Sequence, residues 1–334
     1  MRFHLVWEDA VIRSIRTVTP TVREFIIAPS SGAAKRFAPG SHLNVTVLIN
    51  DQPDTRSYSL VGEPMGDAYR IAVKRQPESR GGSDYMWSLT EGARITVSDP
   101  HNLFELDLGR PQYLLLAGGI GITPIYGMAL ALQRRNADFR LVYAARTADE
   151  LAFADDLRDA LGDRLELRTD DGTRLDLAAE IGRLAPDGDL YLCGPMGLLD
   201  AVRRAWADAG RHPANLRYET FGSSGHAAPE AFTVKIPNLG VEVVVPENQS
   251  MLDALESAGV AVVSDCRRGE CGICKVRVLA SDGEIDHRDV FFSEEEKDAG
   301  EAMCPCVSRV TGGSVTVDTW YRADAISKSL EAAE

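Results

Sequence analysis

The chain has 334 residues, of which 44% are hydrophobic and 26% charged, and its formal net charge is −14. This composition suits a globular protein of two or three domains, whereas so acidic a chain would be repelled by nucleic acid and by anionic membranes. The sequence shows no run of 18 apolar residues and no apolar stretch at its start. We therefore expect a soluble cytoplasmic protein without a membrane segment.

Two changes of composition divide the chain into three parts. The first change lies near residues 108–111, and the second is a stretch rich in Gly, Ser, Ala and Pro at residues 221–229 that is typical of a flexible linker. Each part is close to the usual size of a domain. We therefore expect domains at residues 1–108, 109–225 and 226–334.

The first part predicts an all-β domain, for which a small antiparallel barrel is the simplest arrangement. Apolar and polar residues alternate in segments that are separated by Gly, Pro and Asp turns. The expected strands include residues 42–47, 69–74 and 94–97.

Two motifs in the first part carry groups that suit a flavin. Arg56-Ser57-Tyr58-Ser59 supplies a guanidinium, hydroxyls and an aromatic ring, and Arg80-Gly81-Gly82-Ser83 is a glycine-rich segment that suits a phosphate. Taken singly, the first motif is more often a surface strand and the second an ordinary turn. The flavin interpretation therefore depends on the rest of the chain.

The middle part alternates strand and helix patterns, which predicts a parallel sheet covered by helices. A strand is followed by Gly118-Gly119-Ile120-Gly121, with Thr123 as a possible helix N-cap and Pro124 as first helical residue. A helix N-terminus beside glycines suits a pyrophosphate, although the motif departs from G-x-G-x-x-G and a bare strand-to-helix turn is the alternative. The expected strands are residues 112–117, 139–144, 165–168 and 189–193, and the expected helices include residues 154–161, 197–209 and one through 127–130.

Two further segments of the middle part suggest where a nicotinamide nucleotide would bind. Cys193-Gly194-Pro195 ends a strand at the sheet edge where open α/β folds bind ligands, although a lone buried cysteine is more often simply packed. Asp170 and Asp171 follow another strand, where carboxylates would repel the 2′-phosphate of NADPH. Arg146 and Arg168 lie nearby and weaken that inference, but the acids favour NADH.

The last part carries the cysteine spacing of a plant-type [2Fe–2S] site. Cys266, Cys271 and Cys274 form C-x4-C-x2-C, and a distant fourth thiolate is available from Cys304 or Cys306. A zinc site is less consistent with this pattern, because zinc frameworks usually pair two short C-x2-C steps and this segment has one. Four thiolate ligands also argue against an oxidising compartment, where disulfides would compete for them.

Glycines and acidic residues surround these cysteines. Gly269 and Gly272 would let the loop approach the cluster and direct N–H groups at its sulfurs. From Ala227 to Glu334 the chain has 20 acidic and 10 basic residues. This excess of acid fits a protein partner with a basic docking patch, but it equally fits a role in solubility alone.

The order of these motifs resembles the phthalate dioxygenase reductase family over essentially the whole chain. Members of that family bind FMN, oxidise NADH and pass single electrons through a plant-type ferredoxin domain of the β-grasp type to an oxygenase. The resemblance implies a monomer that serves a Rieske-type terminal oxygenase or O-demethylase. A separate cytochrome P450 is an alternative acceptor, and a redox carrier or sensor is an alternative function. We find no adenine contacts of the kind that FAD would need, which favours FMN.

The resemblance also assigns roles to individual residues. In related ferredoxin domains the fourth ligand precedes Val and a small residue, ahead of a terminal strand, which favours Cys306 before the segment 314–318 and makes Cys304 a bystander. Ser59 would tune the flavin edge, Cys193 would border the nicotinamide, and Phe221 would lie between the flavin and the next domain. The residues assigned to cofactor binding are Arg56, Ser57, Tyr58, Ser59, Val73, Lys74, Gly81, Gly82, Ser83, Gly118, Gly119, Gly121, Thr123, Pro124, Cys193, Gly194, Pro195 and Phe221, and the metal ligands are Cys266, Cys271, Cys274 and Cys306.

Overall fold

The computed structural model describes residues 6–49, 51–76, 81–170, 172, 175–221, 230–247 and 249–319. The chain forms two compact units, Met1–Glu219 and Thr220–Glu334. Most of the expected linker, residues 222–229, lies outside the described residues. Among the helices described, none is both long and apolar enough to cross a membrane.

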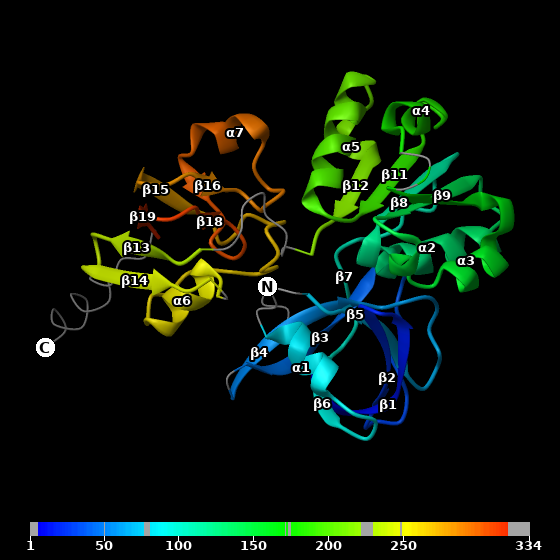
Figure 1. Ribbon diagram of the computed structural model, residues 1–334, viewed down its shortest axis with the longest axis horizontal. Helices are drawn as coiled ribbons and strands as arrows, with labels where there is room; N and C mark the ends of the chain where they lie inside the picture. Colours follow the sequence, from blue (N-terminus) through cyan, green and yellow to red (C-terminus); the bar gives the residue numbers. More distant parts are fainter. Residues whose placement is uncertain are drawn as a thin grey trace, which may run out of the picture. The chain divides into compact units, whose positions relative to one another are not determined.

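The first unit begins with an antiparallel barrel (Figure 1). Its strands follow the order β4-β3-β6-β1-β2-β5, with β7 paired to β3, and a bridge between Leu60 and Ile71 links the two ends of this path. Leu43, Val45 and Val47 are buried at alternate positions of one strand, so the period-two pattern builds the core. The elements are β1 (Trp7–Thr19), β2 (Val22–Pro29), β3 (Ser41–Ile49), β4 (Gln52–Ser59), β5 (Tyr69–Lys74), α1 (Gly82–Ser88), β6 (Arg94–Ser98) and β7 (His101–Asn102).

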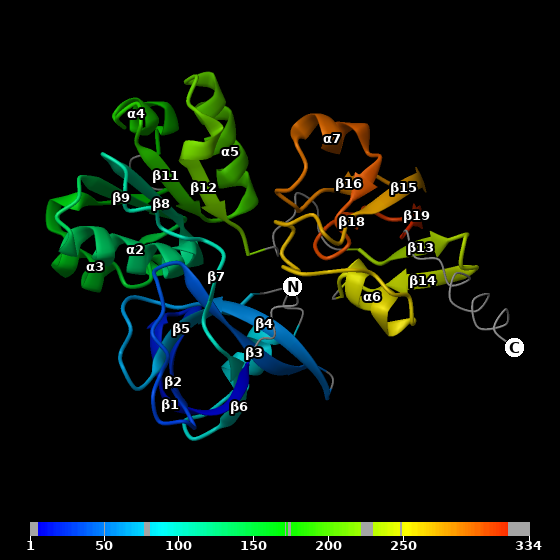
Figure 2. The same ribbon diagram turned by 180° about the vertical axis from the view of Figure 1, so that it is seen from behind.

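The second half of this unit is a five-stranded parallel sheet of order β10-β9-β8-β11-β12. Helices α2 and α3 lie on one face and α4 and α5 on the other (Figures 1 and 2). The chain runs from β8 to one edge and then returns to β11 on the other side of β8, so the strand order switches direction between β8 and β11. The elements are β8 (Tyr113–Gly118), α2 (Ile122–Arg134), β9 (Phe139–Ala145), α3 (Ala154–Leu161), β10 (Leu165–Thr169), α4 (Leu177–Gly182), β11 (Asp189–Cys193), α5 (Met196–Asp208) and β12 (Leu216–Glu219).

The second unit has a mixed sheet of order β14-β13-β19-β15-β17 and a short β16-β18 pair. Helix α6 contributes Met251, Ala254 and Leu255 to the apolar core under this sheet. The three architectures confirm the expected multi-domain fold of antiparallel barrel, parallel α/β sheet and α+β ferredoxin domain. The elements are β13 (Phe232–Ile236), β14 (Val241–Val245), α6 (Met251–Ser257), β15 (Val276–Ser281), β16 (Ile285–Asp286), α7 (Glu294–Ala299), β17 (Ala302–Met303), β18 (Arg309–Val310) and β19 (Ser314–Asp318).

Candidate cofactor sites

The two flavin-type motifs of the barrel lie against each other. A Cβ atom built on Gly82 would be 2.8 Å from both Cγ and Nε of Arg56. The Arg56 side chain therefore packs directly against this glycine, where a larger residue would not fit. Gly81 has φ of 89°, which a residue with a side chain rarely adopts, and it precedes the first turn of α1. Asp54 holds the Arg56 guanidinium through an ion pair of 2.7 Å. The arrangement places a charged donor beside the glycine-rich segment at the start of α1, which fits a phosphate.

The remaining residues of this motif alternate along β4. Ser57 is exposed and its hydroxyl donates to Asn44 Oδ1 at 2.6 Å, whereas Ser59 is buried and pairs with His42 on β3. Burial raises the pKa of Tyr58, and the Arg56 charge opposes this shift only in part. Tyr58 therefore stays protonated at neutral pH and keeps a phenol donor on this strand.

Val73 and Lys74 end strand β5, which packs against the Gly119–Gly121 turn of the nucleotide half. The Val73 carbonyl accepts a hydrogen bond from Trp87 Nε1 at 3.1 Å. Lys74 Nζ lies 3.7 Å from Glu150 Oε2, which joins the barrel to the parallel-sheet half. These contacts bring the barrel residues predicted to bind flavin next to the glycine turn predicted to bind nucleotide.

The two predicted nucleotide segments meet at the switch point of the parallel sheet. Strands β8 and β11 are paired, with Ala117 opposite Cys193. A Cβ atom on Gly121 would lie 2.1 Å from the Cys193 carbonyl oxygen, and one on Gly118 would lie 2.8 Å from Pro195 Cδ. Only glycine allows so close an approach, and ligands of open α/β sheets bind at such a point beyond the carboxyl ends of the strands. Cys193 itself is fully buried.

The prediction that Thr123 caps helix α2 is wrong. A short 3₁₀ turn, Gly119–Gly121, precedes the helix, which already begins at Ile122, so Thr123 and Pro124 lie inside its first turn. The Thr123 hydroxyl donates to the Ile120 carbonyl at 3.0 Å instead of accepting from the helix N–H groups. Gly121 at the N-cap has no side chain, so the start of α2 carries no side-chain cap; the Ile122 N–H donates to carbonyls of the 3₁₀ turn and Pro124 has no N–H.

The region proposed for the adenosine ribose is partly described. Arg168 donates to Glu166 Oε2 at 2.5 Å, so its charge is already paired with a carboxylate on the same strand. Asp170 follows β10 and its N–H donates to the Arg146 carbonyl at 3.2 Å. Asp171 and, in the barrel, Arg80 lie outside the described residues. The pairing of Arg168 removes one of the two cations that weakened the preference for NADH.

In the second unit, the loop that carries the first three cysteines contains glycines with positive φ, which allow a loop to fold closely around a cluster. Gly269 and Gly272 have φ of 77° and 67°, and a Cβ atom on Gly272 would lie 2.3 Å from the Phe291 ring. The N–H groups of Arg268 and Cys271 both donate to Cys266 Sγ at 3.4 Å. Backbone donors directed at a ligand sulfur are a feature of iron–sulfur sites.

The thiols form two neighbouring groups. Cys266 interacts with Cys271, while Cys274 lies with Cys304 and Cys306, and the Sγ atoms of Cys274 and Cys306 are 3.3 Å apart. Hydrogen bonds with the Cys304 and Cys306 thiols hold the pKa of Cys274 far below its usual range. A site with paired thiolates suits two irons that each take two ligands.

The segment with the fourth cysteine forms a turn. Val307 and Ser308 N–H both donate to the Cys304 carbonyl, at 3.1 and 2.9 Å. The turn lets Cys306 meet the cysteine loop, where the Gly269 N–H donates to its sulfur. Cys304 is fully buried among Leu252, Cys274 and Phe292.

Phe221 is described only as part of the second unit, where it is partly buried. The residue before it, Thr220, donates its backbone N–H to Glu270 Oε1 of the cysteine loop at 3.3 Å. Arg268 pairs with the same Glu270 at 3.1 Å. Sequence reasoning did not identify this anchor, because nothing in the local pattern connects two segments that are 50 residues apart.

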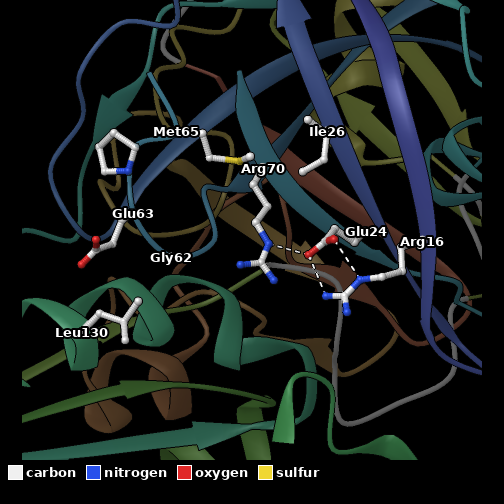
Figure 3. Close-up of a pocket in the computed structure, with 9 residues that line it drawn as sticks. Arg16, Glu24, Ile26, Gly62, Glu63, Met65, Arg70 and Leu130 are labelled. Carbon is white, nitrogen blue, oxygen red and sulfur yellow. Dashed lines mark hydrogen bonds and ion pairs between the residues drawn. The ribbon is translucent and has the colours of Figure 1, made fainter. Parts of the chain in front are cut away.

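A hollow on the first unit lies apart from all these motifs (Figure 3). Glu24 is buried there between Arg16 and Arg70, with a distance of 3.1 Å from Arg16 Nε to its carboxylate. Asp156 of α3 lies 3.5 Å from Arg16 and 3.7 Å from Arg70. None of the predicted cofactor residues lines this hollow. We interpret the ion pairs of Arg16 and Arg70 with Asp156 as a contact between the barrel and helix α3.

Comparisons with known proteins agree with this architecture. Residues 115–204 match the oxidoreductase NAD-binding domain, and residues 234–311 match the 2Fe-2S iron-sulfur cluster binding domain. The beta subunit of the heme-dependent oxidative N-demethylase of Ectopseudomonas mendocina is 36% identical over 312 residues, covering 93% of this chain and 98% of that protein.

Two solved structures share the fold over most of this chain. Phthalate dioxygenase reductase, described as a modular structure for electron transfer from pyridine nucleotides to [2Fe-2S], has a TM-score of 0.76 at 32% identity, covering 93% of this chain and 98% of that one. An intact type IV self-sufficient cytochrome P450 monooxygenase has a TM-score of 0.66 at 32% identity. The match covers 93% of this chain and 41% of that P450 protein.

A flavin-type barrel, an NAD-binding sheet and a plant-type ferredoxin domain in one chain define an iron–sulfur electron-transfer reductase. The chain belongs to the phthalate dioxygenase reductase family. It is thus an NAD-dependent oxidoreductase, the reductase component of an oxygenase system, with FMN, NADH and one [2Fe–2S] cluster as its cofactors.

Proposed function

We propose that this protein takes electrons from NADH and delivers them one at a time to a separate Rieske-type terminal oxygenase, an aromatic dioxygenase, monooxygenase or O-demethylase. One observation carries the proposal: β5 of the barrel packs against the glycine turn at the switch point of the nucleotide sheet. A flavin on the barrel and a nicotinamide on the sheet would therefore meet within one compact unit. When bound, these cofactors supply hydride acceptance and one-electron release, so the protein needs no acid, base or nucleophile of its own.

For the barrel, we propose that Arg56 and the segment Gly81-Gly82-Ser83 bind the FMN phosphate. Their mutual contact supports this role, because a guanidinium already fixed by Asp54 loses little conformational freedom on binding. Tyr58, Ser59 and Ser57 would line the ring, with the Ser59 hydroxyl tuning its edge. Val73 and Lys74 would lie along the same cofactor.

For the nucleotide sheet, we propose that Gly118, Gly119, Gly121, Thr123 and Pro124 bind the pyrophosphate of NADH. The N-terminus of α2, which has no side-chain cap, supports this role, since the positive end of the helix dipole favours an anion. Cys193, Gly194 and Pro195 would form the wall behind the nicotinamide and exclude water from it. Phe221 would close the flavin on the side of the next domain.

For the ferredoxin domain, we propose Cys266, Cys271, Cys274 and Cys306 as the cluster ligands. The hydrogen bond from Gly269 N–H to Cys306 supports the choice of Cys306, because the same loop carries the first three cysteines. Cys304 has no such contact with the loop backbone among the interactions described. It would then pack beside the cluster without binding iron.

We further propose a monomeric, cytoplasmic protein with domains at residues 1–108, 109–225 and 226–334. Four thiolates needed for iron support a reducing compartment. The acidic ferredoxin part supports a partner with a basic docking surface, and the same charge disfavours nucleic acid and anionic membranes as partners.

The first experiment releases and identifies the flavin from anaerobically purified protein and records EPR spectra before and after one equivalent of NADH. We expect FMN and a rhombic [2Fe–2S] signal that appears on reduction. An absence of reduction by NADH would contradict the proposed electron path, and negligible NADH oxidation with every artificial acceptor would favour a carrier or sensor role.

A second acceptor is a separate cytochrome P450. The match to a P450 monooxygenase chain over 93% of this protein favours that alternative, as does the name of the N-demethylase relative, which mentions heme. Reconstitution of NADH-driven turnover with a Rieske oxygenase and, in parallel, with a P450 distinguishes the two. Turnover with the P450 alone would exclude the Rieske proposal.

A further inference from the structure

One buried carboxylate in the second unit links the two segments that carry the cysteines. Asp289 has no exposed surface. Its Oδ1 accepts a hydrogen bond from the Ser308 hydroxyl at 2.9 Å, and its Oδ2 accepts from the Phe292 N–H at 3.1 Å. Ser308 stands two residues after Cys306, so Asp289 is attached directly to the turn that presents the fourth thiol.

The same stretch of chain is also attached to the cysteine loop. The N–H of Val290 donates to the Gly269 carbonyl at 3.0 Å. A Cβ atom on Gly269 would lie 2.9 Å from Cα of Asp289 and 2.6 Å from Val307 Cγ2, so three backbone segments meet at this glycine. Asp289 therefore lies at the junction between the loop and the turn.

Among the residues described, Asp289 pairs with His287 and not with Lys or Arg. Within the part of the chain that the structure describes, the titratable groups that interact with it are His287, with Nδ1 3.4 Å from Oδ1, the Cys304 thiol and the Glu296 carboxylate. Neighbouring Arg288 is paired with Asp286 at 2.7 Å. No ion pair with Lys or Arg is found for Asp289 among these residues.

Asp289 is ionised at neutral pH in the folded protein. Burial by itself would raise the pKa of this carboxyl, but hydrogen bonds from His287, Phe292 N–H and Ser308 outweigh it and lower the pKa below its usual value. A negative charge in so dry a place is poorly screened and acts over several ångströms.

We propose that Asp289 is a positioning residue that ties the cysteine loop to the fourth-ligand turn and, through its buried negative charge, lowers the reduction potential of the cluster. A fixed anion near the cluster opposes the addition of an electron, and neighbouring charge is one of the factors that set such potentials. The inference rests on the proposed cluster ligands. Its physical consequence is a stronger driving force for passing the electron onward.

The test is the variant Asp289→Asn, which keeps the size of the side chain and an oxygen acceptor for Ser308 but removes the charge. The midpoint potential is measured by EPR-monitored redox titration of the loaded full-length protein. We expect the midpoint potential to become more positive by about 59 mV. This shift corresponds to a change of about tenfold in the reduction equilibrium of a one-electron couple. Glu294→Gln removes an acid of the same region whose side chain is 68% exposed, and we expect its potential to equal that of the wild type.

An unchanged or more negative potential in Asp289→Asn would overturn the proposal, as would an equal shift in Glu294→Gln. Ser308→Ala tests the tie separately, because it keeps the charge and removes the hydroxyl. We expect this variant to lose iron to a chelator several times faster than the wild type, with nearly the wild-type potential. If Asp289→Asn takes up no iron, the rate of iron loss from Ser308→Ala is the deciding measurement. A rate equal to that of the wild type overturns the proposal. A wild-type protein without iron or EPR signal would instead refute the cluster assignment itself.

Discussion

Gly121→Ala would place a methyl group where the backbone of a neighbouring strand leaves no room. The added Cβ would lie 2.1 Å from the Cys193 carbonyl oxygen and 2.8 Å from the Gly194 nitrogen. Gly121 itself has φ of −60° and ψ of −7°, a conformation open to any residue, so the cost is steric and not conformational. Because the obstacle is backbone of the paired strand β11, the glycine turn must move away from it. Overpacking of this kind costs about 1–3 kcal/mol.

We expect Gly121→Ala to lose about 2 kcal/mol of unfolding free energy. If a similar cost falls on the closed nucleotide site, the KM for NADH rises at least tenfold, since about 1.4 kcal/mol corresponds to a factor of ten. Urea unfolding measures the first effect, and NADH oxidation with ferricyanide measures the second without the partner oxygenase. Gly197→Ala is the control, because a Cβ atom there meets nothing within 4 Å on helix α5. An unchanged unfolding midpoint together with an unchanged KM would refute the reasoning.

Three further changes test other sites. Arg56→Ala should weaken FMN binding at least tenfold by removing a charge-assisted contact, as measured by fluorescence titration of flavin-free protein, and an unchanged affinity would exclude Arg56 from the phosphate site. Cys306→Ser should lose most of the iron while Cys304→Ser keeps it, and the reverse iron contents would exchange the two assignments. Burial tends to raise the pKa of Glu180, but hydrogen bonds from two arginines lower it below its ordinary 4.5. Its carboxylate therefore stabilises the fold above that pH and ceases to do so as the pH falls through the lowered value. The unfolding free energy of Glu180→Gln should fall short of the wild type most at neutral pH and converge with it once the pH falls below the lowered pKa of Glu180, whereas a pH-independent deficit in urea unfolding would contradict this.

Several elements follow directly from the sequence. The strands Tyr69–Lys74 and Asp189–Cys193 and the helix Ala154–Leu161 have the bounds expected from their patterns. Alternation and helical periodicity are local properties, so a short window contains all the information that they need. The incorrect prediction of a cap at Thr123 shows the limit of local rules. A 3₁₀ turn at Gly119–Gly121 precedes α2, and the helix itself begins at Ile122, before the predicted cap.

The sequence by itself determined the three architectures and the C-x4-C-x2-C spacing, because each depends on residues that are close along the chain. The order of the motifs along the whole chain indicated the cofactors through the family resemblance. Only the tertiary structure decided which distant segments meet. Parallel pairing of β8 with β11 brings Gly121 against Cys193, and the turn after Met303 brings Ser308 to Asp289. Such contacts depend on strand order and register across many residues, and no local pattern encodes the carbonyl that forbids a side chain at Gly121 or the buried charge between the cysteine segments.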